Sequence, residues 1–173
     1  MPEVSKQTND NYVGAAGINS LIADLDDDNG LKRERARESL VAIGRPAVEP
    51  VSKALKHEGP RVRWEAAKAL GEIGDRLAAP ALVDALEDDN AGVRWAAADS
   101  LIAIGHKGLE PLLHALVRRS DSAWLREGAH HVLRALSRRR TLSDTEIAVL
   151  RALEAPEATL EAPEAAFKAI AAR

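Results

Sequence analysis

Hydrophobic residues recur along most of the chain at intervals of three and four, the spacing that is typical of amphipathic helices. In the clearest segment this spacing joins Val62, Ala66, Ala69, Leu70 and Ile73. Proline falls near the start of several such segments and glycine near their ends, as helix boundaries favour. The pattern predicts an all-α protein with helices over 14–26, 31–43, 46–56, 60–73, 76–87, 91–104, 108–118 and 122–137.

These predicted helices form repeating pairs. The segment Arg61–Gly74, RVRWEAAKALGEIG, returns as GVRWAAADSLIAIG at Gly92–Gly105, and more diverged copies start at Leu31 and Trp124. A single pair cannot bury its own apolar stripe, so successive pairs are expected to stack around one continuous core. We predict an array over 14–137, with units at about 14–44, 45–74, 75–105 and 106–137.

The two ends of the chain differ from the repeats. Residues 1–13 are polar without periodicity, and we expect a flexible N-terminal tail. The segment 138–173 contains the capping-box sequence SDTE at 143–146, which predicts the start of a helix. Pro156 and Pro163 are expected to divide the rest into short pieces. We expect this segment to be a C-terminal helical cap that covers the open end of the array, and a partner-binding tail is the alternative.

The repeat pattern, Val-Arg followed by Ala-Ala-x-Ala-Leu-x-x-Ile-Gly, resembles the HEAT repeats of the phycobilisome-lyase-like type. The resemblance extends over residues 18–137 and is strongest in the two central units. It implies a right-handed α–α superhelix, or solenoid, in which the second helix of each unit lines the concave face. It also makes a bilin-lyase-like chaperone an alternative function, although many proteins with repeats of this type have no lyase activity.

Two tryptophans occupy equivalent positions in successive units. On a helical wheel, at about 100° per residue, Trp64 lies nearly opposite the apolar stripe of its helix, and Trp95 takes the same place one unit later. Both indoles are therefore expected to be exposed, on the face that the resemblance makes concave. Exposed large aromatic side chains are typical of binding surfaces. The alternative is that each indole lies flat over neighbouring side chains such as Lys68 and Arg61.

Mixed charges flank this aromatic centre, as in a protein–protein interface that has apolar anchors and a polar rim. We predict that the chain is a non-catalytic scaffold that binds another protein or a peptide segment. Gly71 belongs to a column of equivalent repeat positions that also contains Ile102 and Arg134. It leaves room either for an incoming side chain or for close packing between helices. The predicted partner-binding residues are Glu34, Trp64, Lys68, Trp95, Asp99, Ile102, Glu127, His131 and Arg134.

An acidic residue precedes an arginine by five positions in the turn of every unit. We interpret these pairs as a structural ladder, in which each arginine pairs with turn carboxylates of its own and of adjacent units. A row of charges that binds a ligand is the alternative interpretation. The four pairs are Asp28–Arg33, Glu58–Arg63, Asp89–Arg94 and Asp121–Arg126.

Charge is nearly balanced overall but uneven along the array. The 173 residues include 24 basic and 27 acidic ones, which argues against a protein that coats nucleic acid or a membrane with its whole surface. Residues 118–140, however, contain seven arginines and only two acids. Three kinds of partner fit this basic end: nucleic acid, an acidic protein or another copy of the chain. The alternative is an arginine face that contacts only solvent. Nucleic-acid binding through 118–140, with Trp95, Asp99 and Arg134 resembling the concave face of HEAT-like DNA glycosylases, is the main alternative function.

The amino-acid composition excludes several kinds of functional site. The chain has no cysteine, which excludes disulfides, thiolate catalysis, iron–sulfur clusters and cysteine-ligated zinc. The repeats also resemble those of deoxyhypusine hydroxylases, whose second helices begin with iron-binding His-Glu pairs, but Trp64-Glu65 and Trp95-Ala96 stand at the corresponding positions. We therefore expect no metal, no cofactor and no catalytic residue. Without a long apolar run or a signal-like start, we expect a cytoplasmic protein and no membrane partner; the oligomeric state stays open.

Overall fold

The structure is a computed structural model that describes residues 14–173, so the tail predicted over 1–13 lies outside the described residues. Within the described range all regular elements are helical. No helix in this range has both the length and the hydropathy that crossing a membrane requires. The elements in chain order are α2 (Ala15–Asp24), α3 (Gly30–Ile43), α4 (Arg45–Ala54), α5 (Pro60–Ile73), η1 (Arg76–Ala78), α6 (Ala79–Ala85), α7 (Ala91–Ile104), η2 (Gly105–Gly108), α8 (Leu109–Arg118), α9 (Ala123–Arg138), α10 (Asp144–Glu154) and α11 (Ala158–Ala171).

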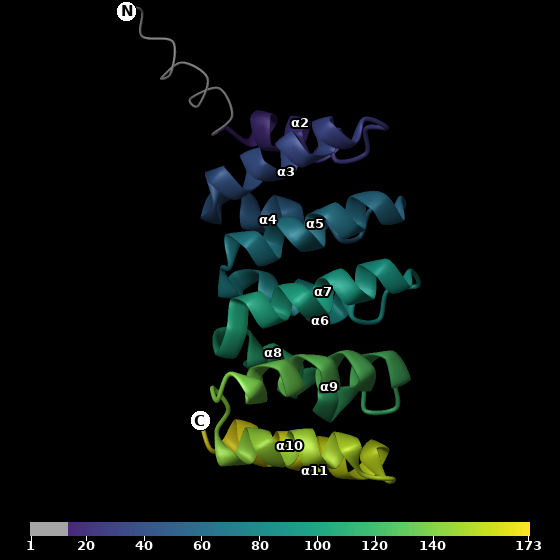
Figure 1. Ribbon diagram of the computed structural model, residues 1–173, viewed down its shortest axis with the longest axis vertical. Coiled ribbons are helices and arrows are strands. Elements are labelled where there is room, and N and C mark those ends of the chain that lie inside the picture. Colours follow the sequence, from purple (N-terminus) through teal and green to yellow (C-terminus); the bar gives the residue numbers. More distant parts are fainter. Residues whose placement is uncertain (1–13) are drawn as a thin grey trace, which may run out of the picture.

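The helices stack in two rows along the long axis of the molecule (Figure 1). One row consists of the second helices of the units, α3, α5, α7 and α9, and the other consists of the first helices, α2, α4, α6 and α8. Aliphatic side chains from both rows fill the space between them as one continuous core. The prediction of a helical solenoid is therefore confirmed. The repeated leucines lie in this core, at most 2% exposed: Leu40, Leu70, Leu101 and Leu133.

Local sequence sets the ends of the helices. Gly44, Gly74 and Gly105 follow α3, α5 and α7 with φ of 72°, 69° and 75°, a backbone region that favours glycine. The sequence predicts one helix over 76–87, but the structure has η1 followed by α6. The Asp75 side chain accepts a hydrogen bond inside η1 and so fixes a separate short turn before α6.

The arginine of each turn bonds backbone carbonyls, not the carboxylate predicted from its own unit. In all four units, Nη1 of this arginine donates to carbonyl oxygens five or six residues earlier, in the turn between the two helices. The extended side chain reaches these carbonyls, which need a donor once the chain leaves the helix. The four arginines are Arg33, Arg63, Arg94 and Arg126. Among the described residues, none of them forms an ion pair with the acid five positions before it, which the sequence had paired with it: Asp28, Glu58, Asp89 or Asp121.

Arg63 also joins two units, as the ladder hypothesis predicts for adjacent units. Its Nε lies 2.7 Å from Asp88 Oδ2 and its Nη2 lies 2.8 Å from Asp88 Oδ1, and Nη2 also donates to Asp89. The Arg63 and Asp88 side chains are only 11% and 9% exposed. A two-point contact of this kind fixes both distance and orientation between units.

The last two helices cover the end of the array, and their places in the two rows are exchanged relative to the units before them. α10 lies against α9 in the row of second helices, whereas α11 lies against α8 in the row of first helices. The predicted capping box between Ser143 and Glu146 is present at the start of α10. The prediction that Pro163 breaks the chain is wrong, because α11 continues through it. The carbonyl that loses its partner belongs to exposed Thr159, where water can bond it.

Glu146 ties this last pair to the array. Its carboxylate is 2% exposed, accepts hydrogen bonds from the Ser143 N–H and from Arg173, and lies 3.1 Å from His106 Nε2. Burial alone raises the pKa of Glu146, but these donors outweigh burial and hold its pKa below the ordinary value of 4.5. The folded state therefore gains stability from this carboxylate above that ordinary pKa and loses it as the pH falls through the lowered value.

We expect Glu146→Gln to lower the free energy of unfolding at pH 7 by about 1–3 kcal/mol, because hydrogen bonds to a charged group are lost. Wild-type stability should fall on acidification, and this variant should lose less over the same range. Urea unfolding at pH 7 and at about pH 3.5 measures both effects. Glu161→Gln, at an exposed position of α11, is the control. Equal losses in the two variants would contradict this role for Glu146.

Candidate protein-binding groove

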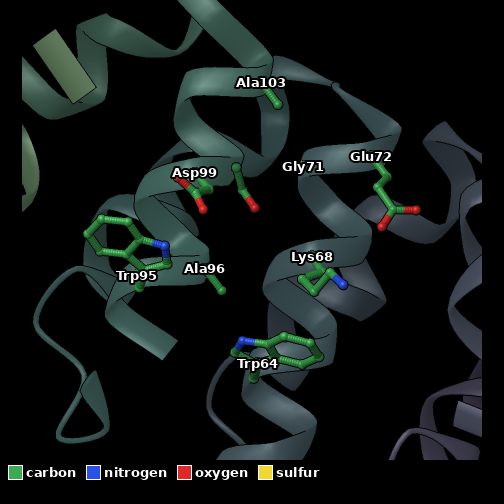
Figure 2. A pocket seen from close by; sticks show the side chains of 9 residues that line it. Trp64, Lys68, Gly71, Glu72, Trp95, Ala96, Asp99 and Ala103 are labelled. Carbon is green, nitrogen blue, oxygen red and sulfur yellow. The ribbon is translucent and has the colours of Figure 1, made fainter. Parts of the chain in front are cut away.

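Helices α5 and α7 place two indoles on the surface. In each helix one side carries the core residues, such as Val62 and Leu70 in α5, and the tryptophan stands on the opposite side. Trp64 is 37% exposed and Trp95 is 59% exposed, as the helical wheel predicts. The two residues come from successive units of one row, so they face the same side of the molecule (Figure 2).

A groove of about 330 Å³ lies between the two indoles. Its floor is made of small side chains from the facing sides of α5 and α7, and its walls carry the indoles and three charged residues (Figure 2). A mostly apolar hollow with a few polar groups is the usual form of a binding site. The groove is lined by Trp64, Lys68, Gly71, Glu72, Trp95, Ala96, Asp99, Ser100 and Ala103.

Close packing of α5 against α7 produces the floor of this groove. A Cβ added at Gly71 would lie 2.5 Å from Ser100 Oγ and 2.8 Å from Ser100 Cα, closer than atoms can approach. The buried Ser100 hydroxyl also donates to the Ala67 carbonyl at 2.7 Å, which bonds the two helices directly. Of the two interpretations of Gly71, the structure shows close helix packing, and the residue still borders the groove.

Each of the two indoles has a polar side chain against its ring. Lys68 Nζ lies over the Trp64 ring, 4.6 Å from its centroid, which is the arrangement of a cation–π contact. The His131 ring of α9 lies against Trp95, with a centroid distance of 4.5 Å and an angle of 42° between the planes. Asp99, one turn after Trp95, approaches His131 Nε2 at 3.6 Å. The alternative of indoles covered by side chains is therefore only partly realised, since both rings retain open surface.

The other predicted partner-binding residues do not all lie at the groove. Glu127 and His131 line a second hollow of about 150 Å³ between α7 and α9, next to Trp95. Arg134 is exposed further along α9, and Glu34 is exposed on α3 without lining the groove. The prediction for Ile102 is wrong: it is 8% exposed and packs in the core.

Ile102 is buried among the aliphatic side chains of the core. Near the end of α7, Arg139 donates a hydrogen bond to the Ile102 carbonyl oxygen at 3.0 Å. The same column contains Gly71, which is also buried. Whether such a position faces solvent depends on how closely the neighbouring helices approach, and a single-helix wheel contains no information about that distance.

Sequence reasoning missed Trp124, which is 45% exposed at the start of α9. It lines the second hollow together with Trp95, and the Arg94 guanidinium lies 4.4 Å from its ring centroid. Its position in the repeat corresponds to Arg61 and Gly92, not to the Trp64 column, so repeat alignment gave no signal. A helical wheel drawn for α9 alone would have placed Trp124 outside the apolar stripe of that helix.

A buried ion cluster beneath the surface was also missed. Glu65 is 4% exposed although it is charged, and Arg37 Nη1 lies 2.6 Å from its carboxylate, with Arg33 Nε at 3.5 Å. Arg37 also lies 3.2 Å from Glu72, so this wall residue of the groove already has a partner. Burial lowers the pKa of Arg37, but the bond to Glu65 and the nearby carboxylates outweigh burial and raise it.

Several arginines of the 118–140 segment have structural partners. Arg119 pairs with Asp84 and Glu87 at 3.1 and 2.6 Å, Arg126 donates to the turn carbonyl of its unit, and Arg139 donates to α7. These contacts use part of the positive charge within the fold. Across residues 14–173, the structure has no group of three His, Asp or Glu side chains that could hold a metal ion.

Two family models match the chain over this array. The model described as HEAT repeats matches residues 18–102, and the model described as PBS lyase HEAT-like repeat matches residues 93–118. The chain is a HEAT-repeat protein, which confirms the resemblance drawn from the repeat pattern. Proteins of this kind commonly mediate protein–protein interactions and are generally non-catalytic.

The crystal structure of an engineered protein is similar over 94% of this chain and 88% of that one, with 18% sequence identity and a TM-score of 0.40. The comparison with curated proteins gives no match.

Proposed function

We propose that the chain is a non-catalytic scaffold that binds a segment of another protein in the groove between α5 and α7. The observation that carries the proposal is the pair of exposed indoles on either side of an apolar hollow of about 330 Å³. A covered indole removes about 150–250 Å² from water, so burying the exposed half of each contributes roughly 2–3 kcal/mol before entropy costs. Aromatic anchors beside a polar rim dominate the affinity of many interfaces.

The rigidity of the site supports the same proposal. α5 and α7 contribute whole helical faces, joined by the Ser100–Ala67 hydrogen bond and by the close approach at Gly71. A preformed site loses little conformational entropy when its partner binds. The partner segment therefore meets two anchors whose positions are already set by the solenoid.

Replacing both anchors tests the proposal. Peptides of 12 residues would be selected from a random phage-displayed library on the immobilised full chain, and the best ones synthesised with a fluorescent label. We expect Trp64→Ala/Trp95→Ala to weaken their binding by at least about tenfold, as lost burial of two indoles requires. Fluorescence anisotropy gives the dissociation constants.

The matched control is Phe167→Ala, which removes an equally exposed aromatic residue from α11, away from the groove. Circular dichroism should show unchanged helicity and melting for all these variants, because each side chain lies outside the core. Peptides that bind the double variant as well as wild type, or that depend on Phe167 instead, would refute the proposed site.

A further inference from the structure

The carboxylates beside Trp95, at one end of the groove, have no lysine or arginine in ion-pair contact among residues 14–173. Asp99 lines the groove and makes no hydrogen bond in the described part of the chain; the His131 Nε2 atom lies 3.6 Å from its carboxylate. Glu127, on the neighbouring α9, borders the far side of Trp95 and has no ion pair among the described residues. Two carboxylates thus lie on either side of the most exposed indole of the chain.

The Trp64 end is different. Lys68 is the one basic residue that lines the groove, and its ammonium group is already placed over the Trp64 ring. Glu72 lines the groove but its carboxylate pairs with Arg37 at 3.2 Å, so it adds little to the charge of the site (Figure 2). The groove therefore has an acidic half at Trp95 and an apolar half, covered by one lysine, at Trp64.

A basic side chain complements the acidic half. A guanidinium or ammonium group stacks favourably on an open indole face and bonds a carboxylate beside it. Arg134 and Arg138 border Trp95 from another hollow, on the α9 side, which Glu127 also lines, and there the two arginines would repel a cation. This repulsion confines the cation to the α5–α7 side, next to Asp99.

Resting on the proposed function, we propose that the partner segment is basic: an arginine or lysine side chain lies against Trp95 and Asp99, and a neighbouring apolar side chain lies against Trp64. The occupant is thus a cationic, partly apolar peptide of another protein. Lys68 limits how tightly such a peptide binds, because its charge has the same sign as that of the ligand. Affinity should also fall as ionic strength rises, because part of it comes from exposed charges.

Charge variants of the groove test this inference with the same selected peptides. We expect the peptides to contain more Arg and Lys than Asp and Glu. Asp99→Asn should weaken their binding about tenfold, by loss of a charge-assisted contact, and Glu127→Gln about two- to threefold, since it acts from the rim. Lys68→Gln should tighten binding about two- to fivefold, as a like charge is removed. Glu110→Gln, an exposed acid on α8 in the other row, should change nothing.

The outcomes separate this inference from the proposed function. Peptides that need Trp64 and Trp95 but are acidic, or that bind more weakly to Lys68→Gln and no more weakly to Asp99→Asn, would overturn the basic partner and leave the docking groove standing. Peptides that do not need the two tryptophans would overturn both. All variants alter exposed or half-exposed side chains, so folding is not at issue.

Discussion

Replacing Arg63 with methionine is expected to lower the free energy of unfolding by about 3–5 kcal/mol at pH 7, because removal of one partner leaves a buried charge unpaired. Arg63 makes a two-point contact with the 9% exposed Asp88 and also bonds two turn carbonyls of its own unit. Methionine keeps the apolar stem of the side chain, so the loss reports the guanidinium and not the packing.

The same variant should change the pH dependence of stability. In the wild type, burial raises the pKa of Asp88, but the bonds from Arg63 and from the Asn90 N–H outweigh burial and hold its pKa below the ordinary value of 3.8. The stabilisation from Asp88 is therefore present above the ordinary pKa and lost as the pH falls through the lowered one. Without Arg63, burial still opposes ionisation of Asp88 but its main partner is gone, so the variant should lose less stability than the wild type on acidification.

Urea unfolding at pH 7 and at about pH 3 measures both effects. Arg61→Met is the matched control, because Arg61 lies on the same helix and makes only exposed ion pairs, at 3.3 and 3.7 Å, with Asp28 and Asp26. Pairs of that kind contribute about 0–1 kcal/mol. A loss at Arg63 no larger than the loss at Arg61 would show that the cross-unit contact does not stabilise the array.

Gly71→Ala is expected to destabilise the protein by about 2–3 kcal/mol, although alanine favours helices by about 1 kcal/mol over glycine. The added methyl would lie 2.5 Å from Ser100 Oγ, 2.7 Å from Ser100 Cβ and 2.8 Å from Ser100 Cα. Because one of these atoms is backbone, α5 and α7 must separate, which also widens the groove and breaks the Ser100–Ala67 hydrogen bond.

Thermal and urea unfolding give the stability change, and the selected peptides give the effect on the groove. Gly30→Ala is the control, since its added Cβ would meet only Arg33 Nη2, at an ordinary 3.6 Å. Adding Ser100→Gly to Gly71→Ala removes two of the three clashing atoms and should recover part of the stability. A single variant as stable as wild type would mean that the two helices are not in close contact there.

The helices and the two anchors could be predicted because both follow from the period of a single helix. Val62 and Leu70 define the core side of α5, and Trp64 then has to lie on the other side. Trp95 takes the equivalent position in the next unit, so the same reasoning predicts that it is exposed. Gly44, Gly74 and Gly105 marked the helix ends because their positive φ favours glycine at these positions.

Features that depend on contacts between helices could not be predicted in the same way. Ile102 is buried because other segments approach its helix closely, and a helical wheel does not report that approach. The spacing of acid and arginine indicated a ladder, but only the structure shows that Arg63 reaches carbonyls in its own unit and Asp88 in the next. The burial of Glu65 likewise depends on another helix, because Arg33 and Arg37 of the preceding unit pair with its carboxylate.

The most direct test of the binding site is fluorine NMR on protein labelled with 5-fluorotryptophan. The chain has three tryptophans, so three signals are expected, and single Trp→Phe variants assign them. Titration with a selected peptide should shift the Trp64 and Trp95 signals most, with a smaller change at Trp124 in the adjacent hollow. Saturable binding that leaves the Trp64 and Trp95 signals in place would contradict docking between α5 and α7.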